Sequence, residues 1–166
     1  PTHEKYVNQI VWSNNKISFE NPDEQSFKTK FNAGEKIYGR FYLSESMQNF
    51  IYKQKKQEID GFSFYFDVYI DGVKQEPMFN QTNIGYDYCK TTTWQIWVHV
   101  PREKGNFGAS DDWVKMVNTA MTPGEHTVKF DLRVKDYEGT VVSGSLVYVK
   151  GKEKVKYGWN LDSYTT

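Results

Sequence analysis

The stretch Thr93-Trp94-Gln95-Ile96-Trp97-Val98-His99-Val100 alternates between apolar side chains and aromatic or polar ones, and this alternation decides the fold class. In an extended strand, successive side chains point to opposite faces of a sheet. One face carries Trp94, Ile96, Val98 and Val100. The other face carries Gln95, Trp97 and His99. The first row predicts burial against a core, and the second places a tryptophan where solvent, a ligand or a partner would meet it.

The same alternation recurs along the chain, at residues 26–31, 36–43, 61–70 and 125–134, and residues 141–150 suit a closing strand. The turn sequence Asn14-Asn15 separates two short strands predicted at residues 6–12 and 16–19, and Asp71-Gly72 ends the strand at residues 61–70. Aromatic residues make up 17% of the 166-residue chain, and they favour strands. The sequence therefore predicts an all-β fold, a single antiparallel β-sandwich of seven to nine strands that is immunoglobulin-like or jelly-roll-like.

Two segments leave the period of two and predict short helices in connections. In residues 44–56, Ser44 or Ser46 would cap a helix whose apolar residues include Met47 and Ile51. In residues 110–121, Ser110 would cap a helix with acidic residues in its first turn. We expect residues 81–89 to form a loop or irregular edge and Gly144 to mark a bulge. The sandwich would span residues 1–150, with residues 151–166 as a C-terminal edge strand or docking arm.

One segment carries a resemblance to known domains. Thr122-Pro123-Gly124-Glu125-His126-Thr127-Val128-Lys129-Phe130 resembles the Pro-Gly-x-aromatic corner before the penultimate strand of immunoglobulin-like and fibronectin-type domains. The resemblance implies a last strand directly afterwards, at residues 145–150. His126 stands where tyrosine is usual and a helix precedes the corner, so a jelly-roll or C2-like strand order stays open.

The outward side chains of the predicted strands suggest a binding surface. If the strands adjoin, one outer face would gather Tyr38, Tyr42, Tyr65, Tyr69, Trp97, Arg40, Gln95 and His99. Aromatic rings with polar neighbours suit protein interfaces and also stack on sugar rings. In the alternative interpretation, these rings only stabilise the sheet, or the two helical segments cover them.

These features predict a non-enzymatic interaction or structural domain, a secreted or cell-surface component of a protein assembly that binds a protein partner or itself. The start at Pro1 favours either a processed, extracellular protein or an excised domain. The alternative function is carbohydrate binding, with Trp97 beside Tyr65, Tyr69 or Tyr86 as the platform.

Composition argues against several other classes. Lys plus Arg and Asp plus Glu both number 21, so no nucleic-acid footprint is predicted. No apolar run approaches the length of about 20 residues that a membrane-spanning helix needs. We expect no cofactor and no metal, since Asp67, Asp71, Asp111 and Asp112 fit turn and cap positions better than a calcium site.

The sequence also argues against an enzyme. It has three histidines and one cysteine, Cys89, which rules out an intrachain disulfide and fits a small buried apolar residue. No motif of a nucleophile elbow, a zinc helix or a phosphate loop is present. A hydrolase would need a concave site in which His99 or His126 meets Cys89 or a carboxylate.

Overall fold

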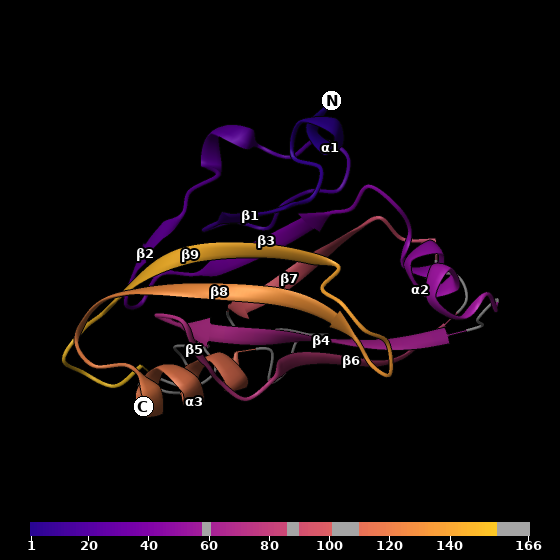
Figure 1. Ribbon diagram of the computed structural model, residues 1–166. Coiled ribbons are helices and arrows are strands. Elements are labelled where there is room, and N and C mark those ends of the chain that lie inside the picture. Colours follow the sequence, from indigo (N-terminus) through magenta and orange to yellow (C-terminus); the bar gives the residue numbers. More distant parts are fainter. Residues whose placement is uncertain (58–60, 86–89, 101–109, 156–166) are drawn as a thin grey trace.

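The computed structural model describes residues 1–57, 61–85, 90–100 and 110–155, and strands are the main regular structure among them (Figure 1). One sheet, sheet A, has the strand order β1-β3-β7 and is antiparallel. Its strands are β1 (Gln9–Ser13), β3 (Ile37–Tyr42) and β7 (Thr93–His99).

The second sheet, sheet B, has the order β2-β9-β8-β4-β5, and β6 also pairs with β4. Its strands are β2 (Lys30–Asn32), β4 (Gly61–Ile70), β5 (Val73–Lys74), β6 (Met78–Gly85), β8 (Gly124–Val134) and β9 (Val142–Lys150). One pair departs from the predicted antiparallel arrangement, because β2 runs parallel to β9. The other paired strands of sheet B are antiparallel.

Helices are short and lie in connections. They are α1 (Thr2–Lys5), the 3-10 turn η1 (Glu24–Ser26), α2 (Met47–Lys55) and α3 (Asp111–Ala120). Both helices predicted from the sequence are confirmed. Ser46 caps α2, because its hydroxyl accepts a hydrogen bond from the Asn49 N–H at 3.1 Å. Ser110 precedes α3 without capping it, since its hydroxyl binds the backbone N–H of Val100 at 2.7 Å.

The two sheets share one hydrophobic core. Trp12 of sheet A lies 4.8 Å from Phe130 of sheet B, measured between ring centroids, and Phe41 lies 6.4 Å from Phe64. α2 and α3 contribute buried side chains to the same core, among them Met47, Ile51, Trp113 and Val117. Each strand therefore has one side turned toward this core and one side turned away from it.

The predicted bulge at Gly144 is wrong. A glycine is needed there because Ile10 lies very close to the backbone. The pairing of β8 with β9 continues through Phe130 and Gly144 without a shift in register. A Cβ atom at Gly144 would lie 2.5 Å from the Cβ of Ile10. The absence of a side chain at this position therefore lets β1 pack closely against β9.

Residues 81–85 continue β6, because Ile84 pairs with Phe62 and Gly85 with Gly61, and the shifted register of β6 against β4 agrees with the predicted irregular edge. Two other local predictions differ from the structure. Residues 26–31 form only part of a strand, since η1 occupies their start and β2 begins at Lys30. The expected short strand at residues 16–19 is absent, because the backbone of Ile17 binds side chains instead of a neighbouring strand.

The C-terminal segment is described only as far as residue 155. Val155 packs against the core and exchanges two hydrogen bonds of 2.8 Å with the Asn118 side chain on α3. The expected edge strand or arm lies largely at residues 156–166, outside the described residues. Among the described helices, none is both long and apolar enough to cross a membrane.

Candidate binding surface

The eight predicted binding residues do not form one surface. Tyr38, Arg40 and Tyr42 lie on β3, and Gln95, Trp97 and His99 lie on β7, so these six belong to sheet A. Tyr65 and Tyr69 lie on β4 in sheet B. β4 pairs with β5, β6 and β8 rather than with β3 or β7. The tyrosines of sheet B therefore point away from the core on the other side of the molecule.

The outer side of sheet A is covered by the N-terminal part of the chain. Tyr38, Arg40, Tyr42 and His99 are all buried, contrary to the expected exposure. The residues that cover this side, 1–8 and 14–28, are called the N-terminal cover here; Figure 1 shows the chain from α1 to β2 beside β1 and β3. The ring of Tyr42 contacts His3 at 5.1 Å and Tyr6 at 6.5 Å between centroids. A second small core results, formed by Val11, Ile17 and Tyr42 with Tyr6 and Phe27.

Two of the predicted binding residues hold this cover in place. The Arg40 guanidinium donates to the Ile17 carbonyl at 2.9 Å and to the Thr93 hydroxyl at 3.1 Å. The Gln95 amide oxygen accepts the Ile17 N–H at 2.6 Å. Burial lowers the pKa of Arg40 from its ordinary value. Arg40 and Gln95 thus satisfy backbone groups of the N-terminal cover.

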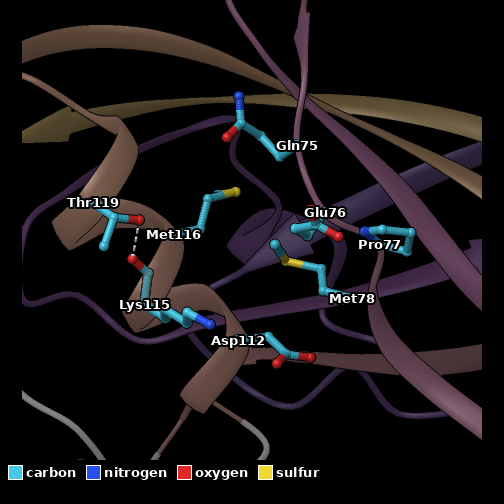
Figure 2. Close-up of a pocket in the computed structure, with 8 residues that line it drawn as sticks. All are labelled: Gln75, Glu76, Pro77, Met78, Asp112, Lys115, Met116 and Thr119. Atoms are coloured by element: carbon cyan, nitrogen blue, oxygen red, sulfur yellow. Dashed lines mark hydrogen bonds between the residues drawn. The ribbon is translucent and has the colours of Figure 1, made fainter.

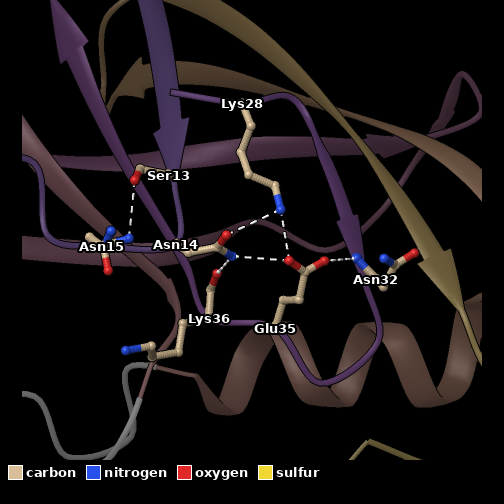
Figure 3. A network of polar contacts seen from close by, with 7 residues as sticks. All are labelled: Ser13, Asn14, Asn15, Lys28, Asn32, Glu35 and Lys36. Carbon is tan, nitrogen blue, oxygen red and sulfur yellow. Dashed lines mark hydrogen bonds and ion pairs between the residues drawn. The ribbon is translucent and has the colours of Figure 1, made fainter. Parts of the chain in front are cut away.

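A polar network holds the cover at its far end (Figure 3). The Lys28 ammonium lies 2.7 Å from the Glu35 carboxylate and donates to the Asn14 side chain at 3.1 Å. The Asn32 N–H donates to the other Glu35 oxygen. Burial opposes ionisation of Glu35, but the bonds from Asn32 and Lys28 outweigh it and lower the pKa of this carboxyl group.

Trp97 is half-buried on the covered side. The Tyr38 and Trp97 ring centroids lie 5.5 Å apart, and the Lys16 ammonium lies 5.1 Å from the Trp97 ring. A platform that combines Trp97 with Tyr65 or Tyr69 is therefore not assembled, because the rings belong to different sheets. Tyr86 and Cys89 lie outside the described residues, so the predicted roles of these two residues stay predictions.

The outer side of sheet B presents a regular array of side chains on β4 and β8. Tyr65 pairs with Arg133, Asp67 with Asp131, and Tyr69 with Lys129. These six residues are called the β4–β8 face. Two tyrosine–cation pairs thus flank one pair of aspartates. Because strands rise about 3.3 Å per residue, the tyrosine–cation pairs lie about 13 Å apart.

The aspartates of this face are buried, whereas Lys129 is exposed and Arg133 is partly exposed. Asp67 and Asp131 expose 4% and 7% of their surface. Arg133 and Lys74 approach the Asp67 carboxylate at 3.6 and 3.7 Å. Lys129 approaches Asp131 at 3.6 Å, and the Ser143 hydroxyl donates to the same carboxylate. These cations offset the repulsion between like charges on neighbouring strands.

Solvent therefore meets positive charges and tyrosine rings. The side chains of Lys74, Lys129 and Arg133 are 58%, 51% and 29% exposed. The Lys129 ammonium lies 5.3 Å from the Tyr69 ring centroid, and both tyrosines of the face are half-buried. The alternation of residues 125–134 indicates that Lys129, Asp131 and Arg133 share the outward side of their strand. Their pairing with Tyr65 and Tyr69 depends on which strands adjoin, which no local pattern reports.

His126 forms a structural clasp with Asp71. Its Nδ1 lies 2.7 Å from the Asp71 carboxylate and its Nε2 lies 2.7 Å from the Thr122 carbonyl oxygen. The other Asp71 oxygen accepts the Thr127 N–H at 2.9 Å. The hydrogen bond to Thr122 and then that to Asp71 raise the pKa of His126, and the bond to His126 lowers the pKa of Asp71. Both ring nitrogens are occupied, so this pair offers no free nitrogen to a substrate.

Three hollows that are open to solvent are bordered by described residues. One of about 450 Å³ lies between α3 and the segment before β6, where Met78 and Met116 are surrounded by Glu76, Asp112 and Lys115 (Figure 2). Two others, of about 610 and 640 Å³, border α2. Neither His99 nor His126 lines any of these three hollows. Within the described ranges, no three His, Cys, Asp or Glu side chains are grouped as a metal site would require.

A scan against protein-family models finds no match, and a search of curated proteins finds no significant relative.

Proposed function

We propose that this protein is a non-enzymatic binding domain that engages a partner through the β4–β8 face. One observation carries the proposal: the tyrosines and cations of this face meet solvent, whereas the aromatic side of sheet A is closed by the N-terminal cover. Tyrosine and arginine are enriched in protein interfaces, and they contribute a large share of binding energy there.

The shape of the face supports a macromolecular partner. Pockets for small ligands are concave and bury about 70–90% of the ligand. The outward side chains of β4 and β8 instead lie in parallel rows on a pleated surface. Such a surface suits a partner that spreads contacts over an area, which is about 800 Å² per partner in typical stable complexes.

The proposal extends to the type of fold and the location of the protein. We propose a β-sandwich of the immunoglobulin-like or jelly-roll-like type, supported by the core that sheets A and B share. Membership in a larger assembly outside the cell or at its surface belongs to the same proposal. Its support is the accessible face with two tyrosines.

Site-directed photocrosslinking tests the proposed surface. A photoreactive phenylalanine analogue would replace Tyr69 in the cells that produce the protein. The matched control carries the analogue at Tyr52, an exposed tyrosine on α2. We expect a discrete crosslinked species from position 69 and none from position 52. Equal labelling at both positions, or labelling at position 52 alone, would contradict the proposal.

Carbohydrate binding is the second candidate, and one observation favours it. Tyr65 and Tyr69 each expose part of a ring beside a cationic hydrogen-bond donor, Arg133 or Lys129. Sugar rings stack on such aromatic surfaces while donors at the rim bind hydroxyl groups. A glycan array comparing the native protein with Tyr65→Ala and Tyr69→Ala distinguishes this function. Binding that both substitutions abolish would support it, and silence across the array would refute it.

A further inference from the structure

We propose that the partner of the β4–β8 face is an extended acidic polypeptide segment with carboxylates at positions i and i+4 and an uncharged residue at i+2. The inference rests on the proposed function, and it specifies the chemistry of the partner at that surface.

The sign of the charge follows from which groups reach solvent. Lys129 and Arg133 within the face and Lys74 beside it reach solvent, while the carboxylates of Asp67 and Asp131 are nearly inaccessible. Three cations against two carboxylates leave one net positive charge. An approaching chain meets the cations first and the carboxylates only beneath them. An anionic ligand is therefore favoured, and opposite charge also speeds its association.

The spacing of the ligand's charges follows from the strand register. Arg133 and Lys129 are four residues apart on β8, opposite Tyr65 and Tyr69 on β4. A ligand in extended conformation has the same rise of about 3.3 Å per residue, so its side chains at i and i+4 match this separation of about 13 Å. Each ligand carboxylate would then meet one cation with a tyrosine ring beside it.

Residue i+2 of the ligand should not carry a negative charge. Residue i+2 of such a ligand would lie over Asp67 and Asp131, which face each other between the two cation positions. A third carboxylate there would meet two buried negative charges and would be repelled. This arrangement disfavours ligands with closely and evenly spaced charge, such as nucleic acids. A polypeptide can place charged and uncharged side chains in the required alternation.

Three synthetic peptides with the native protein provide the test. All three are nine-residue peptides of Ser, Gly and Thr. Two of them also carry two glutamates each, and the third is an uncharged control with two glutamines instead. The first peptide has glutamates at i and i+4, and the second has them at i and i+2. Titration into isotopically labelled protein, followed by NMR, reports affinity and locates the contact. We expect shifts at β4 and β8 with the first peptide and affinity about tenfold weaker for the second, a difference of about 1.4 kcal/mol.

Charge-reversed and charge-conserving variants connect the binding to the face. Lys129→Glu should abolish binding of the first peptide, whereas Lys129→Arg should retain it. If Lys129→Glu fails to fold, the comparison of the three peptides with the native protein still decides the outcome. Equal affinity for the i+4 and i+2 peptides, shifts away from β4 and β8, or no binding at all would overturn the inference. If position 69 crosslinks to a partner but the i+4 and i+2 peptides bind equally well, only this inference is overturned. If position 69 gives no crosslink and no peptide binds, the proposed function is overturned as well.

Discussion

Asp67 on β4 and Asp131 on β8 lie directly opposite each other, and both carboxylates are almost inaccessible to solvent. Like charges in such cross-strand positions destabilise a sheet unless neighbouring groups compensate them. Asp67 has two cations within 3.7 Å, Arg133 and Lys74, whereas Asp131 has Lys129 and the Ser143 hydroxyl. The negative charge of Asp67 is therefore compensated by more cations than that of Asp131. These cations place positive charge on the side of the sheet that faces solvent.

Neutralising each aspartate in turn should reveal this asymmetry. We expect Asp67→Asn to lower the free energy of unfolding by about 1 kcal/mol more than Asp131→Asn, because it leaves two cations without a counter-charge. Urea denaturation of both variants measures the difference. Equal losses would show that the two carboxylates are compensated alike. Both variants should also bind the i,i+4 acidic peptide more tightly, because the face gains positive charge.

Gly144 permits another precise test of packing. Gly144→Ala would place a Cβ atom 2.5 Å from that of Ile10, so the strands must move apart. We expect a loss of about 1–3 kcal/mol in unfolding free energy, the usual cost of an overpacked core. Gly85→Ala is the matched control, because a Cβ atom there meets no atom within 4 Å. A near-neutral Gly144→Ala would mean that β1 does not pack closely on β9.

A buried hydroxyl group on β9 offers a substitution without loss of stability. Tyr148 is fully buried, its hydroxyl has no hydrogen-bond partner among the described residues, and burial, followed by the charge of Glu35, raises its pKa to about 12. Removing an unsatisfied buried hydroxyl relieves its desolvation cost, which is about 1–3 kcal/mol. We expect Tyr148→Phe to leave the melting temperature unchanged or to raise it. The control Tyr52→Phe, at an exposed tyrosine, should leave it unchanged. A clear loss of stability would show that the Tyr148 hydroxyl makes a bond.

The His126–Asp71 clasp predicts a pH window for stability. The pKa of His126 is raised in the folded protein, so its contribution is complete below the unfolded value of about 6.5 and is lost as pH rises through the folded value. The pKa of Asp71 is lowered, so its contribution is present above about 3.9 and is lost as pH falls through the folded value. Between these limits both groups are charged.

A double-mutant cycle with His126→Gln and Asp71→Asn measures this coupling. The Asp71 side chain is half exposed, so we expect a coupling of at most about 1 kcal/mol near pH 5.5. The coupling should decline toward both alkaline and strongly acidic pH. A coupling that does not change with pH would show that the ring and the carboxylate interact without charge.

Local patterns predicted the strands and helices better than they predicted the surface. The unbroken alternation of residues 61–70 and the Asp71-Gly72 turn correctly located β4 and its end. The parity of Tyr38, Arg40 and Tyr42 was also right, since all three point away from the shared core. Parity gives the side of a sheet, however, and says nothing about what covers that side.

The N-terminal cover could not be predicted because long-range polar contacts hold it. Residues 20–25 follow neither a period of two nor a helical period. Ile17 is held by side chains that lie 23 and 78 residues away, Arg40 and Gln95. The β4–β8 face was missed for a related reason, since each of its pairs joins residues that lie 60 to 68 positions apart in the sequence.

The hold of Gln95 on the cover gives a last prediction, which is local rather than global. Gln95→Ala removes the acceptor of the Ile17 N–H, and nothing else in the substitution disturbs the apolar contacts of Ile17, Tyr6 and Tyr42. We expect the Ile17 amide to exchange its hydrogen at least about tenfold faster, because opening of the segment costs about 1.4 kcal/mol less. Amide exchange in β8 and β9 should stay unchanged, which serves as the internal control. Native-state hydrogen exchange followed by NMR measures both. If exchange accelerates equally in β8, Gln95 supports the whole fold and the cover does not open as a separate unit.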